Sequence, residues 1–183
     1  NPEIEVVAMN DLGDAENLAY LLKYDTAYGV SKFNASASED KKKIIVDDKP
    51  VAFLSVKAPK ELPWGDLKID VVIESTGLFT SSEKAKAHLD AGAKRVVITA
   101  PTKDDTTTVL MGINEEKLET CQISSNASCT TNAASPLIQI LDGEIGIEKA
   151  ILNTVHGYTA SQSIVDGPSK KDWKEGRAAA QNI

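Results

Sequence analysis

Apolar runs that favour β-strands alternate with helical segments over the first two thirds of this sequence, and this alternation limits the fold most. The strand-forming runs cover residues 4–9, 70–74, 95–99 and 121–125. Helices are predicted from about Asp14, a plausible N-cap, and over residues 81–91, where Thr80 and Glu83 have capping-box spacing. With 42% hydrophobic residues the chain can bury a core. The pattern predicts an α/β fold with a mostly parallel sheet and helices on both faces.

Small and polar residues follow the predicted strands at their carboxyl ends. Ser75, Thr76 and Gly77 follow one run, and Thr99 and Ala100 close the next. In an open α/β sheet the ligand crevice lies outside the carboxyl ends of the strands, where small residues allow close approach. The alternative is a plain turn into the next helix.

Asn10 and Asp11 follow the first predicted strand. Dinucleotide-binding folds place a ribose-binding carboxylate at such a position. The alternative is that Asp11 caps the next helix.

Cys129 stands in the run SNASCTTN, between a predicted strand at 121–125 and a predicted helix at 130–141 that Pro136 should distort. A helix N-terminus favours an anion, lowers a thiol pKa and offers N–H donors to an oxyanion. The alternative is a packed, inert thiol.

His156 ends an apolar run at 147–156, predicted as a strand that could bring the ring to this thiol. His88 reads as an ordinary helical histidine satisfied by hydrogen bonds.

Charge and cysteine content exclude several classes of protein. The formal net charge is −7 and the pI is near 4.9, which argues against nucleic-acid binding. Cys121 and Cys129 have no CxxC spacing, so neither a disulfide framework nor a metal site is expected. An apolar stretch of membrane-spanning length and a signal-like start are both missing, so a soluble, cytoplasmic protein is expected, without membrane partners.

Several long motifs resemble one family. These are SNASCTTNAASPL, TVHGYTASQ and VDGPSKKDWKEGRAAAQNI, together with AMNDL, LPWGDL, ESTGLF and GAKRVVITAP. In this order they strongly resemble the phosphorylating glyceraldehyde-3-phosphate dehydrogenases, over nearly the whole chain. The resemblance implies that Cys129 is the catalytic nucleophile and His156 its base.

The resemblance also implies NAD as the cofactor. Leu12 offers nothing to receive a 2′-phosphate, and Asp11 would repel one, so NAD is expected rather than NADP. Lys57 stands where the family often has an arginine, and a lysine keeps the charge but lacks the flat guanidinium that stacks on adenine. Lys174 likewise replaces an arginine and keeps only its charge. The cofactor-binding residues expected are Asn10, Asp11, Leu12, Lys57, Ser75, Thr76, Gly77, Thr99, Ala100 and Pro168. The residues expected to bind substrate and phosphate are Ser128, Thr130, Thr159 and Lys174.

The domain organisation is predicted from the motifs that the sequence contains and from the glycine-rich turn that it lacks. No glycine-rich GxGxxG turn occurs, so the chain is interpreted as an internal fragment. Residues 1–127 would form a Rossmann-type NAD-binding domain, incomplete at its N-terminus. Residues 128–183 would begin an α+β catalytic domain with the active-site helix, the strand of His156 and an ordered loop.

The expected function is glycolytic oxidation of glyceraldehyde 3-phosphate with inorganic phosphate, by a homotetramer according to the resemblance. The fragment alone is expected to be inactive. One alternative is a dehydrogenase of another phosphorylated aldehyde, such as erythrose 4-phosphate. Another is a non-catalytic fragment that serves binding or assembly. A thiol hydrolase would leave the nucleotide motifs unexplained.

Overall fold

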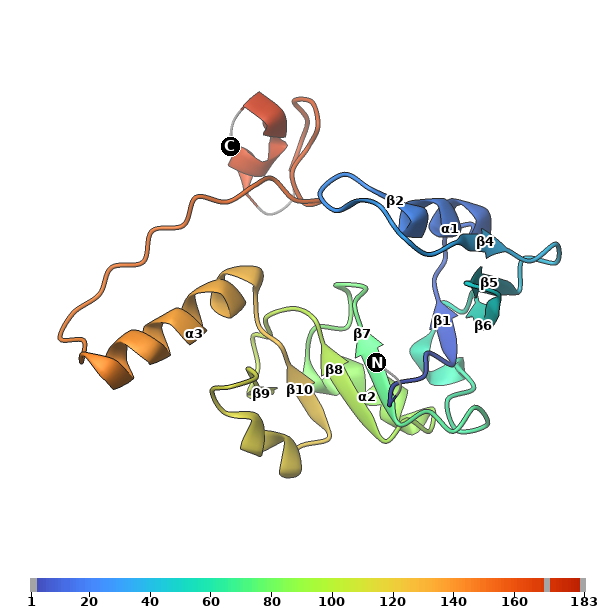
Figure 1. Ribbon diagram of the computed structural model, residues 1–183, viewed down its shortest axis with the longest axis horizontal. Coiled ribbons are helices and arrows are strands. Elements are labelled where there is room, and N and C mark those ends of the chain that lie inside the picture. Colours follow the sequence, from blue (N-terminus) through green and yellow to red (C-terminus); the bar gives the residue numbers. More distant parts are fainter. Residues whose placement is uncertain (1–2, 170–171, 182–183) are drawn as a thin grey trace. The chain divides into compact units, whose positions relative to one another are not determined.

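The computed structural model describes residues 3–169 and 172–181 (Figure 1). The chain divides into two compact units, residues 1–136 and residues 137–183. Within the described ranges, no helix has both the length and the apolar character needed to cross a membrane.

The first sheet of the larger unit has one parallel strand pair and two antiparallel pairs. Its strand order is β1 (Ala8–Asn10), β6 (Lys49–Leu54), β5 (Lys43–Val46) and β4 (Ala35–Ala37). β1 runs parallel to β6, and it is shorter than the predicted 4–9 because their ladder covers only Ala8 to Asn10. Residues 43–56 alternate around the run DDKP, which predicts a hairpin, and β5 and β6 form it, with Asp47 and Asp48 of the turn at positive φ.

Helix α1 (Ala15–Lys23) covers this sheet. Asp14 caps it as predicted, because its side chain accepts hydrogen bonds from the backbone N–H groups of Glu16 and Asn17. Ala15 and Ala19 are buried in one cluster with Ile44 and Phe53 of the sheet. The small and polar residues of segment 25–40 predict a loop, but the segment contains β4 and part of a small hairpin. That hairpin pairs β2 (Tyr24–Asp25) with β3 (Gly29–Val30).

The second sheet of the larger unit is parallel throughout. Its strand order is β7 (Val71–Glu74), β8 (Arg95–Ile98), β10 (Ile123–Ser125) and β9 (Thr107–Thr108). In register, Glu74 lies opposite Ile98 and Ile98 lies opposite Ser125, so three strands end at one level. Figure 1 shows β7, β8 and β10 side by side. These strands confirm the predicted mostly parallel sheet.

Helix α2 (Ser82–Asp90) connects β7 to β8, as the sequence predicts. Its N-cap is Ser81, whose side chain accepts the Lys84 N–H, and not Thr80 as the capping-box spacing suggested. Asp104, in the loop after β8, accepts hydrogen bonds from the backbone N–H and the hydroxyl of Ser82, at 2.7 and 3.0 Å. A hydrogen bond from Thr106 is the largest cause that lowers the pKa of Asp104, to about 2.

The core of the larger unit lies between α2 and the second sheet. Its buried members are Leu62, Trp64, Val72, Ala85, Ala93, Val96 and Ile98. Leu54, the last residue of β6, and Val56 just after it pack against this cluster, so the end of the first sheet contacts the core of the second. Short 3-10 helices lie at η1 (Pro59–Glu61) and η2 (Glu115–Glu119).

The turn after α2 depends on two glycines. Gly92 has a φ of +106°, and a Cβ built on it would lie 2.5 Å from both the Cα and the N of Gly65. Gly65 donates its N–H to the carbonyl of Ala91 at 3.0 Å. The two backbone segments therefore touch, and only glycine fits at this approach.

Helix α3 (Cys129–Glu144) begins in the larger unit and ends in the smaller one, with Pro136 inside it. The predicted strand at 147–156 is not formed: these residues carry no regular structure, and Ile151 and Val155 are exposed. A strand needs a partner for its backbone groups, and none of the described strands pairs with this run. Beyond it lie η3 (Trp173–Gly176) and η4 (Ala179–Gln181).

Residues 161–169 and 172–181 contact each other inside the smaller unit. Ser163 donates its N–H to the carbonyl of Glu175 and accepts the N–H of Ala179 through its own carbonyl, each at 2.9 Å. Arg177 pairs with Asp166 at 2.7 Å. The loop before η3 is therefore tied to η3 and η4.

Candidate active site

The carboxyl ends of β7, β8 and β10 form one edge of the second sheet. Because Glu74, Ile98 and Ser125 are in register, the segments that follow them leave the sheet at the same edge. The structure thus brings together several residues predicted from the sequence to form a site. They are Ser75, Thr76, Gly77, Thr99, Ala100, Ser128 and Cys129.

Cys129 occupies the first position of α3, as the sequence predicts. Ser128 caps this helix: its hydroxyl accepts the Thr131 N–H at 3.1 Å, and its carbonyl accepts the Asn132 N–H at 3.0 Å. The first N–H groups of a helix have no acceptor inside the helix, and its dipole is positive there. The exposed Cys129 therefore lies where a thiolate and a developing oxyanion are favoured. Thr130 is the next residue of this turn.

Ser125 holds the turn before Cys129 in place. It is 1% exposed, its hydroxyl donates to the carbonyl of Ala100 at 2.7 Å, and it accepts the Ala127 N–H at 3.0 Å. Ala127 has a φ of +58°, a left-handed conformation that is uncommon for alanine. The Asn132 side chain donates to the carbonyl of Asn126 at 2.7 Å, which clamps the same turn from the helix side.

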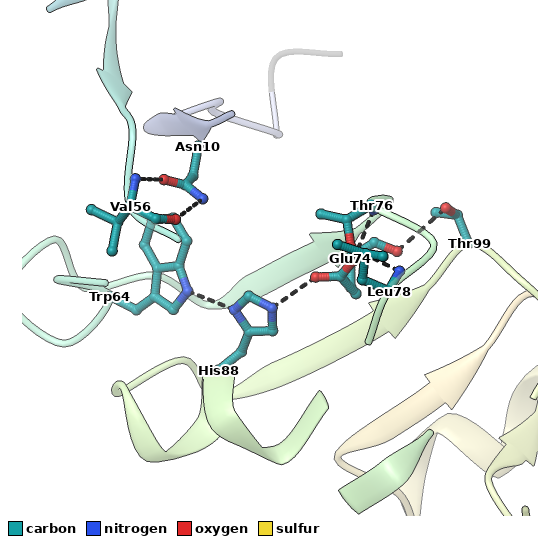
Figure 2. Close-up of polar contacts among 8 residues, drawn as sticks. All are labelled: Asn10, Val56, Trp64, Glu74, Thr76, Leu78, His88 and Thr99. Atoms are coloured by element: carbon teal, nitrogen blue, oxygen red, sulfur yellow. Dashed lines mark hydrogen bonds and ion pairs between the residues drawn. The ribbon is translucent and has the colours of Figure 1, made fainter. Parts of the chain in front are cut away.

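Glu74 fixes the turn that follows β7. One of its carboxylate oxygens accepts the Thr76 N–H at 2.8 Å and the Thr76 hydroxyl at 2.5 Å (Figure 2). Burial raises the pKa of Glu74, but the hydrogen bonds from His88 and Thr76 outweigh burial and hold this pKa below its ordinary value. The Glu74 carbonyl accepts the Thr99 N–H at 3.0 Å. The turns at 75–78 and 99–100 are therefore both attached to one residue.

The side chain of Asn10 joins two segments of the first sheet. Its side-chain amide donates to the carbonyl of Val56 at 3.0 Å and accepts the Val56 N–H at 2.9 Å (Figure 2). Both polar atoms of the amide thus join the ends of β1 and β6, and Asn10 positions its neighbours Asp11 and Lys57. Both polar atoms of the Asn10 side chain contact the backbone of Val56, and its contact with the cofactor stays a prediction.

Asp11 lies at the carboxyl end of β1 and is exposed to solvent. One carboxylate oxygen accepts the Gly13 N–H at 2.7 Å, and a Cβ on Gly13 would lie 3.1 Å from that oxygen. Leu12 beside it is 62% exposed. An exposed carboxylate fixed in orientation by a backbone N–H suits the hydroxyls of a ribose, so these residues fit the adenosine half of NAD.

The other predicted site residues lie in the smaller unit. His156 is exposed in the irregular segment, with Nδ1 2.6 Å from the carbonyl oxygen of Gly157. Thr159 accepts from or donates to the Ser161 hydroxyl at 3.2 Å. Pro168 and Lys174 are exposed, and Lys174 belongs to η3. Cys129 belongs to the other unit, so the pairing of Cys129 with His156 stays a prediction.

Comparison with protein families matches both parts of the chain. Residues 1–82 match a model described as glyceraldehyde 3-phosphate dehydrogenase, NAD binding domain, and residues 128–183 match the C-terminal domain of the same family. The chain belongs to the glyceraldehyde-3-phosphate dehydrogenase family. This family assignment and the Rossmann-type fold agree with the resemblance found in the motifs, and both predictions are confirmed.

Curated relatives align over the whole chain or nearly so. Glyceraldehyde-3-phosphate dehydrogenase 1 of Trichormus variabilis is 50% identical over 187 residues, which is 100% of this chain and 54% of the relative. The enzyme of Chlamydia muridarum is 50% identical over 185 residues, 100% of this chain and 55% of the relative. The cytosolic enzyme of Trypanosoma brucei brucei is 47% identical over 181 residues, 99% of this chain and 54% of the relative. The chain spans about half the length of these relatives.

Four residues that sequence reasoning did not select contribute to the geometry of the candidate site. They are Glu74, His88, Ser125 and Asn132, and each holds a turn at the carboxyl edge or supports a residue that does. A carboxylate that ends an apolar strand was the one signal in the sequence that could have selected Glu74. The other three lie in patterns that ordinary packing also produces.

Proposed function

We propose that this protein oxidises glyceraldehyde 3-phosphate with NAD and inorganic phosphate, giving 1,3-bisphosphoglycerate. The observation that carries the proposal is the position of Cys129 at the start of α3, at the edge where the turns after β7 and β8 also emerge. The substrate is supported by the relatives, whose names identify them as glyceraldehyde-3-phosphate dehydrogenases.

In the proposed reaction the Cys129 thiolate attacks the aldehyde carbon, forming a C–S bond and a hemithioacetal oxyanion. His156 takes the thiol proton as a base and stabilises the oxyanion. Bound NAD supplies the acceptor for the hydride that leaves this carbon, which leaves a thioester on Cys129. A phosphate oxygen then attacks the thioester carbon, and Cys129 departs as the thiolate while the acyl phosphate is released.

The remaining predicted residues hold the reactants in this scheme. Ser128, Thr130, Thr159 and Lys174 hold the phosphate groups of the substrate and of the attacking phosphate. Asp11, Leu12, Lys57, Ser75, Thr76, Gly77, Thr99, Ala100 and Pro168 hold NAD. The Ser128 hydroxyl also lies 2.8 Å from the Thr131 hydroxyl. In this scheme the same hydroxyl therefore caps α3 and contacts the substrate.

We also infer a cytosolic location and assembly as a homotetramer. The location is supported by the cytosolic relative of Trypanosoma brucei brucei. The tetramer rests on the family resemblance. Size-exclusion chromatography with light scattering measures the assembly directly, and a stable monomer would contradict it.

The first experiment tests whether Cys129 is an activated nucleophile. Cys129 should react with iodoacetamide faster than Cys121, and its rate should stay nearly constant between pH 8.5 and 7. The rate of an ordinary thiol falls about tenfold per pH unit below its pKa, because only the thiolate reacts. The pH dependence separates activation from the greater exposure of Cys129. Parallel pH profiles for the two cysteines would reject the activated thiolate.

The second experiment tests the assigned roles in the protein as it is naturally produced. Cys129→Ser should abolish oxidation, while Cys121→Ser, the matched control, should leave it nearly unchanged. His156→Asn should slow oxidation by about 10²–10⁴-fold, the usual contribution of a positioned base. Comparison of kcat/KM for glyceraldehyde 3-phosphate and erythrose 4-phosphate identifies the aldehyde. An unchanged acylation rate in His156→Asn would reject its role.

A further inference from the structure

A chain of buried hydrogen bonds runs beneath the turn after β7 and takes no part in the proposed chemistry. The Trp64 indole Nε1 donates to His88 Nδ1 at 3.0 Å, and His88 Nε2 lies 2.9 Å from one carboxylate oxygen of Glu74. The side chains of His88 and Glu74 are only 5% and 3% exposed. Figure 2 shows the chain of contacts from Trp64 to Thr76.

The indole determines which ring nitrogen of His88 carries the proton. Tryptophan has one N–H and no acceptor, so Nδ1 of His88 must present its lone pair to Trp64. The ring proton is then on Nε2 and is donated to Glu74. A second proton on Nδ1 would place two donors face to face. The two hydrogen bonds thus hold His88 in one tautomer, with its Nε2 proton directed to the Glu74 carboxylate.

The second oxygen of Glu74 determines the shape of the turn. It accepts both the N–H and the hydroxyl of Thr76, and the Thr76 oxygen then accepts the Leu78 N–H at 3.1 Å. Residues 75–78 are exposed, so these contacts hold the turn from its inner side. Loss of the His88 bond would free the carboxylate to rotate and would release Thr76.

Resting on the proposed function, we propose that Trp64, His88 and Glu74 are positioning residues that hold residues 75–78 in the conformation that binds NAD. The imidazole and the indole are buried in the core, so both act through Thr76 and not by contact with the cofactor. If loss of the chain leaves the turn competent for one tenth of the time, the apparent Kd for NAD rises about tenfold.

The first test compares two replacements of His88 in the protein as it is naturally produced. His88→Leu removes both hydrogen bonds, whereas His88→Gln keeps an acceptor for Trp64 and a donor for Glu74. Calorimetry should give a Kd for NAD about tenfold higher in His88→Leu and within about threefold of the unmodified protein in His88→Gln. Lys86→Gln, which removes an exposed ion pair with Asp90 on the same helix, is the control and should leave the Kd unchanged.

The second test uses the tautomer. In Glu74→Gln, the amide must turn its oxygen toward Thr76 and its N–H toward His88, which requires a proton on His88 Nδ1 that Trp64 blocks. Adding Trp64→Phe removes that block, so the double variant should bind NAD more tightly than Glu74→Gln alone. ¹⁵N NMR of histidine should show the proton on Nε2 in the unmodified protein and on Nδ1 in the double variant.

Hydrogen exchange supplies a readout that does not need NAD. The amides of Thr76 and Leu78 should exchange faster in His88→Leu, while those of β8 stay protected, which also shows that the variant is folded. If His88→Leu does not fold, Glu74→Gln with and without Trp64→Phe decides the question by the same measurements.

The results separate this inference from the proposed function. If the unmodified protein binds NAD and a folded His88→Leu variant binds it equally well, with unchanged exchange at Thr76, the inference is overturned and the proposed function stands. If the unmodified protein binds no NAD, the proposed function fails and the inference fails with it.

Discussion

The side-chain amide of Asn10 joins the ends of β1 and β6, and its replacement should loosen the edge that carries Asp11. Asn10→Ala removes two hydrogen bonds to Val56, of 3.0 and 2.9 Å, in a partly buried setting. At about 0.5–1.5 kcal/mol for each bond, the free energy of unfolding should fall by about 1–3 kcal/mol. Asn10→Asp should cost more at neutral pH, because a carboxylate oxygen would then face the Val56 carbonyl.

The acidic variant also predicts a pH effect of defined sign. A protonated Asp at position 10 regains a donor, so the native state raises the pKa of the new carboxyl. The deficit relative to unmodified protein should be complete at neutral pH and should shrink as the pH falls through that raised pKa toward about 4.

Urea unfolding gives the free energies for Asn10→Ala, and hydrogen exchange at the Val56 amide gives the local effect. Asn17→Asp, on the exposed side of α1, is a control that should change stability by less than about 0.5 kcal/mol. If Val56 stays as protected in Asn10→Ala as in the unmodified protein, the bridging role of Asn10 is refuted.

Three further predictions concern single positions. Gly92→Ala should lower stability by more than about 3 kcal/mol, because it adds a backbone clash with Gly65 to the strain of a positive φ. Gly112→Ala, at φ +76° with open space, should cost only about 1–2 kcal/mol; equal losses in thermal unfolding would contradict this. The pKa of Asp104 is lowered from 3.8 to about 2, so its stabilising contribution is complete above about pH 3.8 and is lost toward pH 2. Asp104→Asn should therefore weaken the dependence of the melting temperature on pH over that range. If the melting temperature changes with pH as steeply as in the unmodified protein, Asp104 makes no such contribution. Asp11→Ala should reduce the preference for NAD over NADP, measured as the ratio of kcat/KM values, and a constant ratio would reject its role.

Local patterns were enough to predict much of the larger unit. The alternation of strands and helices predicted the parallel sheet. The small polar residues between a predicted strand and a predicted helix indicated that Cys129 lies at the start of a helix. His88 was expected to be satisfied by hydrogen bonds, and it is. These features depend on neighbours in the sequence, which is why periodicity and capping rules reach them.

Contacts between distant residues could not be predicted in this way. The Asn10 amide meets a backbone 46 residues away, and the Trp64 indole meets His88 24 residues away. Nothing in the local sequence indicates which partner a side chain will find. The expected strand before His156 failed for a related reason: β propensity describes the segment, but a strand also requires a neighbour to pair with.

Because β7, β8 and β10 end at one edge of the sheet, the opposite edge is a suitable place to attach a probe. Turns at the amino ends of these strands lie at the opposite edge of the sheet from the turns after β7, β8 and β10, where Ser75, Thr99 and Cys129 lie. A dye or an affinity label is best attached there, for example at the exposed Glu116 in η2. The tight corner at Gly92, although on that same side, has no room for such an attachment. A probe on η2 could follow folding in real time while the opposite edge stays free for ligand titrations.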